Sequence, residues 1–128
     1  MAKAKIKKIL IVDDEKDFTE LVKTVLEETG KYIVETVNHG QLALSAAKNF
    51  KPHLILLDLM LPDLEGAVVA EQLGDEGSGV QATPVIFLTG MITVDEEKER
   101  EGSIGGRKFL AKPVGIRELI ECVEQNVL

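Results

Sequence analysis

The hydrophobic positions of this chain form short apolar runs that alternate with longer segments of helical periodicity. The run at 54–57, Leu-Ile-Leu-Leu, is uninterrupted and lies between Pro52 and Pro62. Because proline interrupts helices, a short apolar run bounded in this way is typical of a strand buried on both faces. Asp58 follows the run directly. The pattern therefore predicts that Asp58 stands at the carboxyl end of an interior strand, where open α/β sheets bind ligands.

The rest of the chain repeats this alternation of strand and helix. Apolar or β-branched runs predict further strands at 8–12, 32–37, 84–88 and 109–111. Helical periodicity predicts helices within 15–30, 42–50, 66–73, 95–101 and 116–127. Five strands alternating with five helices indicate a doubly wound α/β fold, (βα)5, with a five-stranded parallel sheet covered on both faces.

Three connecting segments carry local expectations. Asn38 is a suitable N-cap for the helix that ends near residue 50. The glycine-rich stretch 74–83 is predicted to be a mobile surface connection. Residues 93–96 match a capping box, and the helix they open over 95–101 carries five acids against two bases, so we expect it to be weakly anchored to the sheet.

Length and charge limit the function classes. A chain of 128 residues predicts one domain, 1–128. The formal net charge of -7 argues against direct nucleic-acid binding by this domain. No apolar run approaches the ~20 residues that span a bilayer, so no membrane segment is expected. Cys122 is the only cysteine, which excludes an internal disulfide and favours a reducing cytoplasm.

Candidate chemistry lies at the predicted strand ends. Asp13 and Asp14 end the first strand, Asp58 the third, Thr89 the fourth and Lys112 the fifth. Right-handed crossovers bring the carboxyl ends of parallel strands to one edge of the sheet, so we expect these side chains to converge. Clustered carboxylates repel one another and need a cation, and oxygen ligands suit Mg²⁺. A lysine and a hydroxyl beside them predict Mg²⁺-dependent phosphoryl transfer onto or near an aspartate.

Four motifs carry a resemblance to a known family. They are Val12-Asp13-Asp14-Glu15, Asp58-Leu59-Met60-Leu61-Pro62-Asp63 with Gly66, Thr89-Gly90, and Phe109-Leu110-Ala111-Lys112-Pro113. Together, in this order and spacing, they resemble the receiver domain of bacterial two-component response regulators. The resemblance covers the whole chain and implies a flavodoxin-like sheet with strand order 2-1-3-4-5, an order known for this family. It also implies a phosphoacceptor signalling domain that promotes its own phosphorylation and dephosphorylation rather than an enzyme.

The resemblance assigns a role to each acidic residue. Asp58 resembles the phosphoacceptor that takes a phosphoryl group from a phosphohistidine of a sensor kinase or phosphotransfer protein. Asp14 resembles the direct Mg²⁺ ligand, and Asp13 the ligand that binds the ion mainly through water. The backbone carbonyl of Met60 would complete the protein's share of the coordination shell.

The same resemblance implies a conformational switch. Lys112 resembles the lysine that pairs with the acceptor before transfer and with phosphoryl oxygen afterwards, and its bond to Pro113 is usually cis in the family. Thr89 resembles the hydroxyl that moves toward the phosphoryl group. Phe109 resembles the aromatic residue that turns inward with it.

The family's output surface corresponds here to the helix at 95–101, the strand at 109–111 and the helix at 116–127. This surface is the family's usual dimerisation face, so a homodimer through it is expected to be possible. The cognate kinase and the downstream target are not readable from the sequence.

Other interpretations of the same residues remain open. Asp58 could initiate a turn before Leu-Pro, Asp13 and Asp14 could cap a helix, and Phe109 could be plain core. A phosphatase of the haloacid dehalogenase type also uses an aspartate, Mg²⁺ and a lysine, but it needs a second aspartate where this chain has Glu15. A docking module that is not phosphorylated is the third alternative.

Overall fold

The computed structural model describes residues 5–90, 103–104 and 107–127. The strands are β1 (Lys7–Val12), β2 (Tyr32–Val37), β3 (Leu54–Asp58), β4 (Val85–Thr89), β5 (Ser103–Ile104) and β6 (Arg107–Ala111). The α-helices are α1 (Lys16–Glu28), α2 (Ala43–Phe50), α3 (Gly66–Gly74) and α5 (Ile116–Asn126), and two short 3₁₀ turns are η1 (Gly40–Leu42) and η2 (Glu76–Ser78). The helix predicted over 95–101 lies outside the described residues.

The strands form one sheet in the order β2-β1-β3-β4-β6-β5. The first five of these are parallel neighbours, which confirms the predicted doubly wound fold and the order 2-1-3-4-5 once β6 is counted as the fifth parallel strand. The two-residue strand β5 pairs antiparallel with β6 and was not predicted. Two residues are too few to carry an alternation of apolar and polar side chains that a sequence could reveal.

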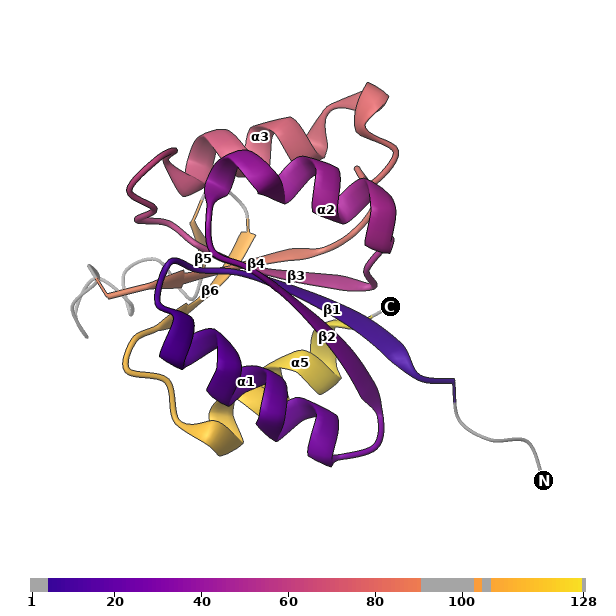
Figure 1. Ribbon diagram of the computed structural model, residues 1–128, viewed down its shortest axis with the longest axis vertical. Coiled ribbons are helices and arrows are strands. Elements are labelled where there is room, and N and C mark those ends of the chain that lie inside the picture. The colour runs from indigo at the N-terminus through magenta and orange to yellow at the C-terminus, as the bar shows by residue number, and fades with distance from the viewer. Residues whose placement is uncertain (1–4, 91–102, 105–106, 128) are drawn as a thin grey trace.

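Helices cover both faces of the sheet. Figure 1 shows α2 and α3 on one face and α1 and α5 on the other. The strand residues divide between these faces with a period of two: Leu10 and Val12 of β1 pack toward α2 and α3, whereas Ile9 and Ile11 pack toward α1 and α5. Each helix therefore buries its own apolar stripe, and the sheet separates two hydrophobic clusters.

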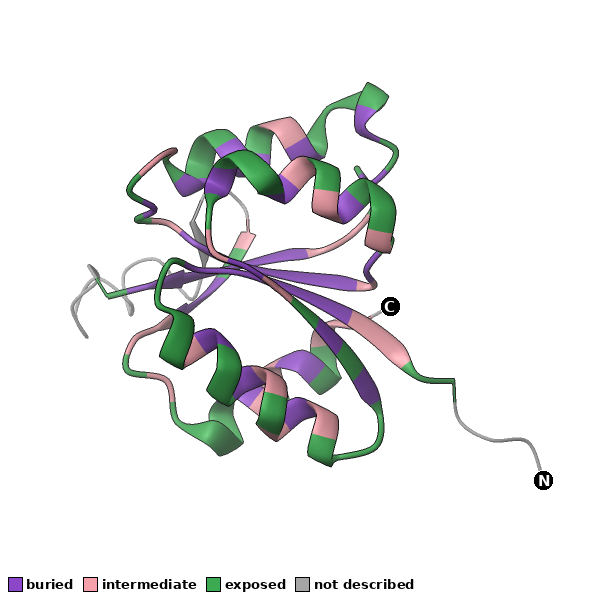
Figure 2. Cartoon of the chain, viewed as in Figure 1, coloured by how far each residue is buried: buried purple, intermediate pink, exposed green. Residues whose placement is uncertain are grey.

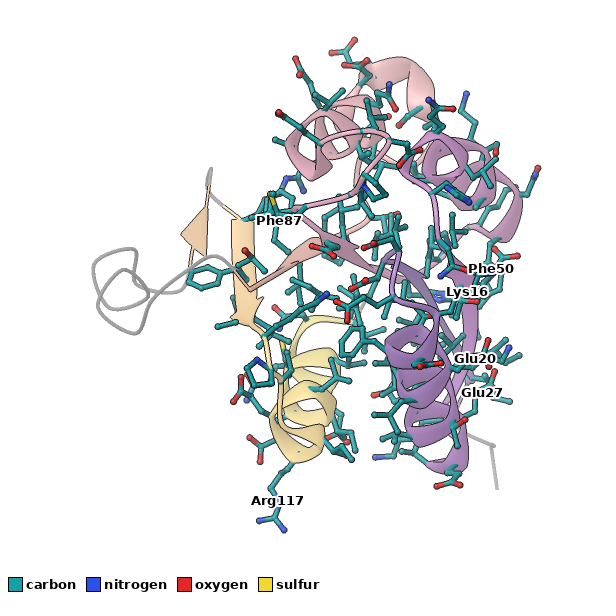
Figure 3. The ribbon with its side chains drawn as sticks, turned by 60° about the vertical axis from the view of Figure 1, so that its left-hand side comes forward. Lys16, Glu20, Glu27, Phe50, Phe87 and Arg117 are labelled. Carbon is teal, nitrogen blue, oxygen red and sulfur yellow. The ribbon has the colours of Figure 1, made fainter. Side chains whose placement is uncertain are left out.

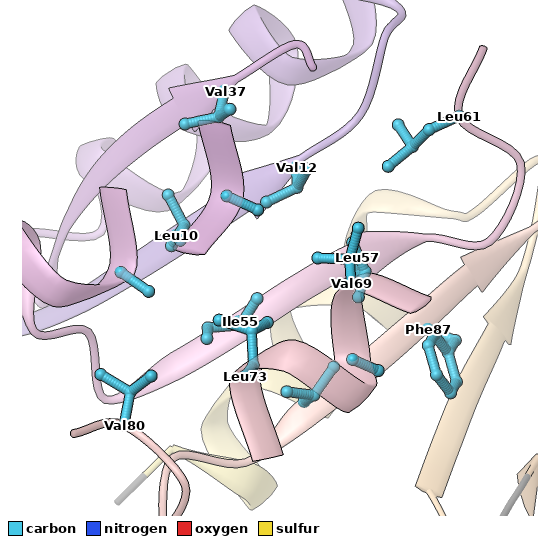
Figure 4. Packing of buried hydrophobic residues seen from close by; sticks show 14 of the residues in the cluster. Leu10, Val12, Val37, Ile55, Leu57, Leu61, Val69, Leu73, Val80 and Phe87 are labelled. Carbon is cyan, nitrogen blue, oxygen red and sulfur yellow. The ribbon is translucent and has the colours of Figure 1, made fainter. Parts of the chain in front are cut away.

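Strand β3 lies at the centre of both clusters. All five of its residues are buried, as the purple central strands of Figure 2 illustrate. Ile55 and Leu57 meet Val69 and Leu73 of α3 in the cluster drawn in Figure 4, and the intervening leucines contact the opposite cluster. Burying one such side chain contributes about 1.5–3 kcal/mol, so the strand that ends in Asp58 is the most firmly held platform for a site.

One local expectation was wrong. The Asn38 side chain does not cap a helix; its Nδ2 donates a hydrogen bond of 2.8 Å to the Asp13 carbonyl, and η1 begins without a side-chain cap from its own N-terminal residue. The 74–83 connection lies mostly at the surface, as expected, but Ser78 and Val80 within it are buried. The Ser78 hydroxyl donates to the Leu73 carbonyl at 2.8 Å, so this turn is tied to the end of α3.

Within the described ranges, no helix has the length and apolar character needed to cross a lipid bilayer.

Candidate functional site

The register of the sheet brings the predicted strand-end residues to one edge. Val12 pairs with Leu57, so Asp13 on β1 and Asp58 on β3 lie level with each other. The hydrogen-bonded ladder continues past the strand ends: Asp13 N donates to the Val37 carbonyl at 3.0 Å, and Lys112 N donates to the Thr89 carbonyl at 2.7 Å. Backbone hydrogen bonds alone therefore hold these strand ends in position.

Three carboxylates gather at this edge. Asp13, Asp14 and Asp58 each offer a carboxylate oxygen, and these atoms all lie within 4.8 Å of one another. Asp13 is fully buried and Asp58 nearly so, whereas Asp14 is exposed. Clustered hard oxygen donors with one solvent-facing member fit a divalent cation that enters from solution and keeps part of its water shell.

Lys112 supplies the cation that these acids face. Its Nζ lies 2.6 Å from Asp13 Oδ2, 2.9 Å from Glu15 Oε1 and 3.2 Å from Asp58 Oδ2. The Lys112 side chain is only 15% exposed, and its ammonium lies 4.9 Å from the centre of the Phe18 ring. The contact with Asp13 is a close ion pair, and its attraction offsets part of the cost of burying both charges.

Burial and pairing shift the ionisation of this pair. Burial raises the pKa of Asp13, and the neighbouring Asp58 carboxylate raises it further, against the lowering effect of Lys112 and of the Glu15 N–H. Burial alone would lower the pKa of Lys112, but its contacts with Asp13 and Glu15 outweigh burial and raise it. Lys112 is therefore fully charged at neutral pH.

The two oxygens of Asp58 have different surroundings. Oδ1 accepts a hydrogen bond of 2.9 Å from the Met60 N–H, and Oδ2 faces Lys112. Gly66 N donates to the Leu59 carbonyl at 3.0 Å, so the loop after Asp58 folds back against its own start. One carboxylate oxygen is thereby oriented by the backbone while the other points at a positive charge.

The remaining predicted residues lie on the two neighbouring strands. Thr89 ends β4, beside β3, and its side chain is buried. Phe109 of β6 is the register partner of Phe87 of β4, and both belong to the cluster on the α3 face (Figure 3 labels Phe87). Phe109 is buried in this structure, and the bond between Lys112 and Pro113 is cis.

Comparisons with known proteins agree with this geometry. A sequence model of the response regulator receiver domain matches residues 9–124. The chain belongs to this family. It is 38% identical over 115 residues to the alkaline phosphatase synthesis transcriptional regulatory protein PhoP of Bacillus subtilis. The aligned region covers 88% of this chain and 45% of PhoP. It is 32% identical over 119 residues to the polar-differentiation response regulator DivK of Brucella anthropi, covering 92% of this chain and 94% of DivK.

A solved structure shows the same likeness. The receiver domain of the Francisella response regulator 1452 superposes with a TM-score of 0.76 at 30% identity, covering 93% of this chain and 94% of that one. The chain spans about half the length of PhoP and nearly all of DivK. This is a signalling-domain family of two-component systems rather than a family of catalytic enzymes.

Two hollows adjoin the acidic cluster of the receiver domain. An open cleft of about 450 Å³ is lined by Asp14, Glu15, Asp58, Met60, Gly90 and Lys112. A second, more apolar groove of about 510 Å³ shares Glu15, Gly90 and Lys112 with it and adds Phe18, Leu21, Pro113 and Val114. The shared residues show that the two hollows are neighbours, with Asp58 lining only the cleft.

Two site contacts were missed by reasoning from the sequence. Glu15 was expected to start a helix and belonged to the first family motif, but no contact was predicted for it, and it pairs with Lys112 across 97 positions of the chain. Asn38 was expected to cap a helix, yet it holds the backbone at Asp13 and also donates to Thr19 Oγ1 at 3.4 Å. A polar residue within three positions of a strand end was the signal available for both, but their partners depend on where other strands end.

Proposed function

We propose that this receiver domain, spanning 1–128, accepts a phosphoryl group on Asp58 from a phosphohistidine of a sensor histidine kinase or phosphotransfer protein. The observation that carries the proposal is the position of Asp58 between Lys112 and two further carboxylates at the strand ends. A buried carboxylate with an ammonium 3.2 Å away has a positive charge at hand that can pair with part of the negative charge a phosphoryl group would bring.

The transfer step follows from the surroundings of Asp58. One carboxylate oxygen attacks phosphorus, a P–O bond forms, and the P–N bond to the donor imidazole breaks. The electron pair of that bond leaves with the imidazole, which is neutral once it holds a proton. The Lys112 ammonium, freed from Asp58, then pairs with a phosphoryl oxygen, and the Met60 N–H keeps the acceptor oriented.

The carboxylate set fits a Mg²⁺ ion. Asp14, Asp13, Asp58 and the backbone carbonyl of Met60 would hold it, with Asp14 as the direct ligand and Asp13 acting mainly through water. Bound there, Mg²⁺ would neutralise the charge that collects on the phosphoryl oxygens. The exposed Asp14 provides the entry side for the ion.

The partner kinase would dock over the groove next to Asp58. Leu21 of α1 is 51% exposed, and Phe18, Pro113 and Val114 extend the same apolar lining toward Lys112. A histidine presented by an apolar helical surface could reach Asp58 at the carboxyl edge of the sheet, where this groove lies, since β3 is covered on both faces. In the same proposal the domain works in the cytoplasm, where the unpaired Cys122 stays reduced.

Phosphorylation would be read out through the neighbouring strands. Thr89 would move toward the phosphoryl group, and Phe109, which is buried here, would turn inward with it. The surface formed by the 95–101 segment, β6 and α5 would then bind a target or a second copy of the chain. This part of the proposal rests on the family resemblance of Thr89 and Phe109.

The direct test is phosphorylation with a small acyl phosphate. The protein should take up one phosphoryl group from acetyl phosphate in the presence of Mg²⁺, detected as a mass increase, and Asp58→Asn should take up none. Asp75→Asn, an exposed aspartate of the α3–η2 turn, is the matched control and should react normally. Failure of the wild-type protein to gain mass would overturn the proposal.

The same experiment separates the alternatives. Modification of Asp13 rather than Asp58, located by peptide mapping, would favour a phosphatase of the haloacid dehalogenase type, and no modification would favour a docking module. The comparisons do not favour either alternative.

A further inference from the structure

Asp63 makes an unusual connection between two loops. Its Oδ1 accepts a hydrogen bond of 3.0 Å from Gly40 N, and its Oδ2 accepts one of 3.0 Å from Gln41 N. These two N–H groups begin η1, where no residue of the turn itself supplies a side-chain cap. Asp63 therefore caps η1 from a position more than 20 residues away, using both carboxylate oxygens.

Close packing reinforces this connection. A Cβ at Gly40 would lie 3.1 Å from Leu61 Cδ1, 3.1 Å from Leu64 Cβ and 3.2 Å from Val69 Cγ2. The η1 turn thus presses directly on the 59–65 loop, with no space for a larger residue. Polar and apolar contacts hold the same two segments together.

The 59–65 loop joins the acceptor to α3. The two ends of the loop meet, because Gly66 at the start of α3 lies against the backbone of Asp58 and Leu59. Between the ends, the loop carries Met60, whose side chain is 57% exposed and whose backbone N–H orients Asp58. Contacts beyond Met60, rather than the Met60 side chain, must therefore set where the Met60 backbone lies.

We propose that Asp63 is a positioning residue that clamps the 59–65 loop onto η1 and so preorganises the Met60 backbone for Mg²⁺. The inference rests on the proposed function, since it presupposes the metal site. Replacing a group that orients a metal ligand commonly lowers metal affinity by about 10–100-fold. The two N–H donors also lower the pKa of Asp63, Gln41 first and Gly40 second, which agrees with a carboxylate held in its charged form.

The test measures Mg²⁺ affinity directly. Mg²⁺ is titrated into the ¹⁵N-labelled protein, and the shift of the Met60 amide signal reports the dissociation constant without any phosphorylation. Asp63→Ala should raise this constant about tenfold, while the signals of residues outside 39–42 and 58–66 keep their wild-type positions. Asp63→Asn, which keeps a single oxygen acceptor, should fall between the two.

The matched control is Glu65→Gln. Glu65 is an exposed acid of the same loop, and as N-cap of α3 it makes no side-chain capping hydrogen bond. Its substitution removes the same charge and should change the dissociation constant by less than about twofold. Hydrogen exchange of the Gly40 and Gln41 amides should accelerate in Asp63→Ala and stay unchanged in Glu65→Gln.

Three outcomes would overturn the inference: equal dissociation constants for Asp63→Ala and the wild type, equal losses for Asp63→Ala and Glu65→Gln, or no Mg²⁺ binding by the wild type. The proposed phosphoryl transfer is tested separately. It is refuted when wild-type protein that binds Mg²⁺ takes up no phosphoryl group.

Discussion

Lys112 illustrates how much one side chain does in this site. It faces three carboxylates from two segments: Asp13 and Glu15 in the connection between β1 and α1, and Asp58 at the end of β3. Removing any one of these carboxylates would bring the net charge of the cluster closer to zero. Removing the lysine would leave buried negative charge unpaired. Lysine suits this position because its ammonium can turn from one oxygen to another, which a planar guanidinium cannot do as freely.

Gly66 tests how tightly the acceptor loop is folded. A Cβ at this position would collide with the Asp58 carbonyl and lie 2.6 Å from Leu59 Cα, and backbone atoms cannot move aside as a flexible side chain would. We expect Gly66→Ala to lower the free energy of unfolding by about 1–3 kcal/mol. Gly77→Ala, where a Cβ meets nothing within 4 Å, should change it by less than about 0.5 kcal/mol. Urea unfolding of both variants checks this; equal stabilities would contradict the close approach.

We expect the Met60 side chain to affect how fast a phosphoryl group on Asp58 would be hydrolysed. Its exposed apolar side chain lines the open cleft and offers no group that could orient a water molecule toward an acyl phosphate. We therefore expect slow autodephosphorylation, and a several-fold faster loss of phosphate in Met60→Asn, measured by the decay of the phosphoprotein after the donor is removed. Met60→Leu should decay at the wild-type rate, and an unchanged rate in Met60→Asn would discard the idea. Met91 follows Thr89 by two positions, as Met60 follows Asp58, and it lies outside the described residues.

His53 provides a pH-dependent contact far from the site. Its Nδ1 accepts a hydrogen bond of 2.9 Å from Lys8 N, so the ring is neutral there. Burial lowers the pKa of His53, and the charges of Lys7 and Lys8 lower it further. Since the unfolded chain binds this proton at higher pH, the stabilisation is complete above pH 6.5 and declines as pH falls from 6.5 toward the folded-state pKa.

An NMR titration should therefore place the midpoint of His53 below 6.5. In His53→Gln, the free energy of unfolding should fall less between pH 7.5 and pH 5.5 than in the wild type. A His53 midpoint above 6.5 would contradict the neutral hydrogen-bonded ring.

At the scale of elements, the open edge of the sheet is protected by α1. Strand β2 ends the sheet on one side, and exposed Ile33 lies on it. Lys23 Nζ donates to the Val34 carbonyl at 3.0 Å, and Val34 N donates to Glu27 Oε2 at 3.0 Å (Figure 3 labels Glu27). Lys23 and Glu27 form an ion pair 3.8 Å apart. Together they bind the backbone groups of Val34 that a neighbouring strand would otherwise pair with.

Removing the couple should make the edge available for association. We expect Lys23→Ala combined with Glu27→Ala to self-associate at concentrations where the wild type does not, because unpaired strand edges recruit further strands. Lys16→Ala combined with Glu20→Ala removes the same charges, at the same spacing, from exposed positions of α1 and serves as the control. Light scattering after gel filtration distinguishes the two double variants, and identical elution would refute the protective role.

At the scale of the whole molecule, the fold concentrates like charge at one edge. Asp13, Asp14 and Asp58 are delivered there by β1 and β3, so the same topology that builds the core also creates repulsion. A protein can retain such repulsion when a ligand present in the cell relieves it, and stability is then linked to that ligand.

Mg²⁺ should therefore stabilise the folded domain. At a Mg²⁺ concentration about 100 times its dissociation constant, the free energy of unfolding should rise by about 2.7 kcal/mol. Asp14→Asn should lose most of this gain and be no less stable than the wild type without Mg²⁺, because Asp14 is exposed and repelled by its neighbours. Asp17→Asn, an acid in the first turn of α1, is the control and should retain the gain. Thermal unfolding with Mg²⁺ or with EDTA measures both effects.

The sequence alone determined the order of the elements and the strand ends that carry chemistry. Uninterrupted apolar runs such as Leu54–Leu57 require burial on both faces of the sheet. The acid or base that follows such a run then lies at the edge where the carboxyl ends of the parallel strands meet. The fold class and the convergence of Asp13, Asp14, Asp58 and Lys112 followed from these local patterns, whereas the strand order was implied by the family resemblance. Short-range periodicity is sufficient for this, because it is set by which face of each element avoids water.

Only the tertiary structure decided which polar groups became partners. Glu15 meets Lys112, Asn38 holds the backbone of Asp13, and Asp63 caps a turn on another loop. The antiparallel strand β5 and the burial of Val80 belong to the same class of outcome. Each depends on the distance between segments remote in sequence, and a hydrogen bond or ion pair forms only within a few tenths of an ångström of its optimum. Periodicity says which face a residue takes, but it carries no information about that distance.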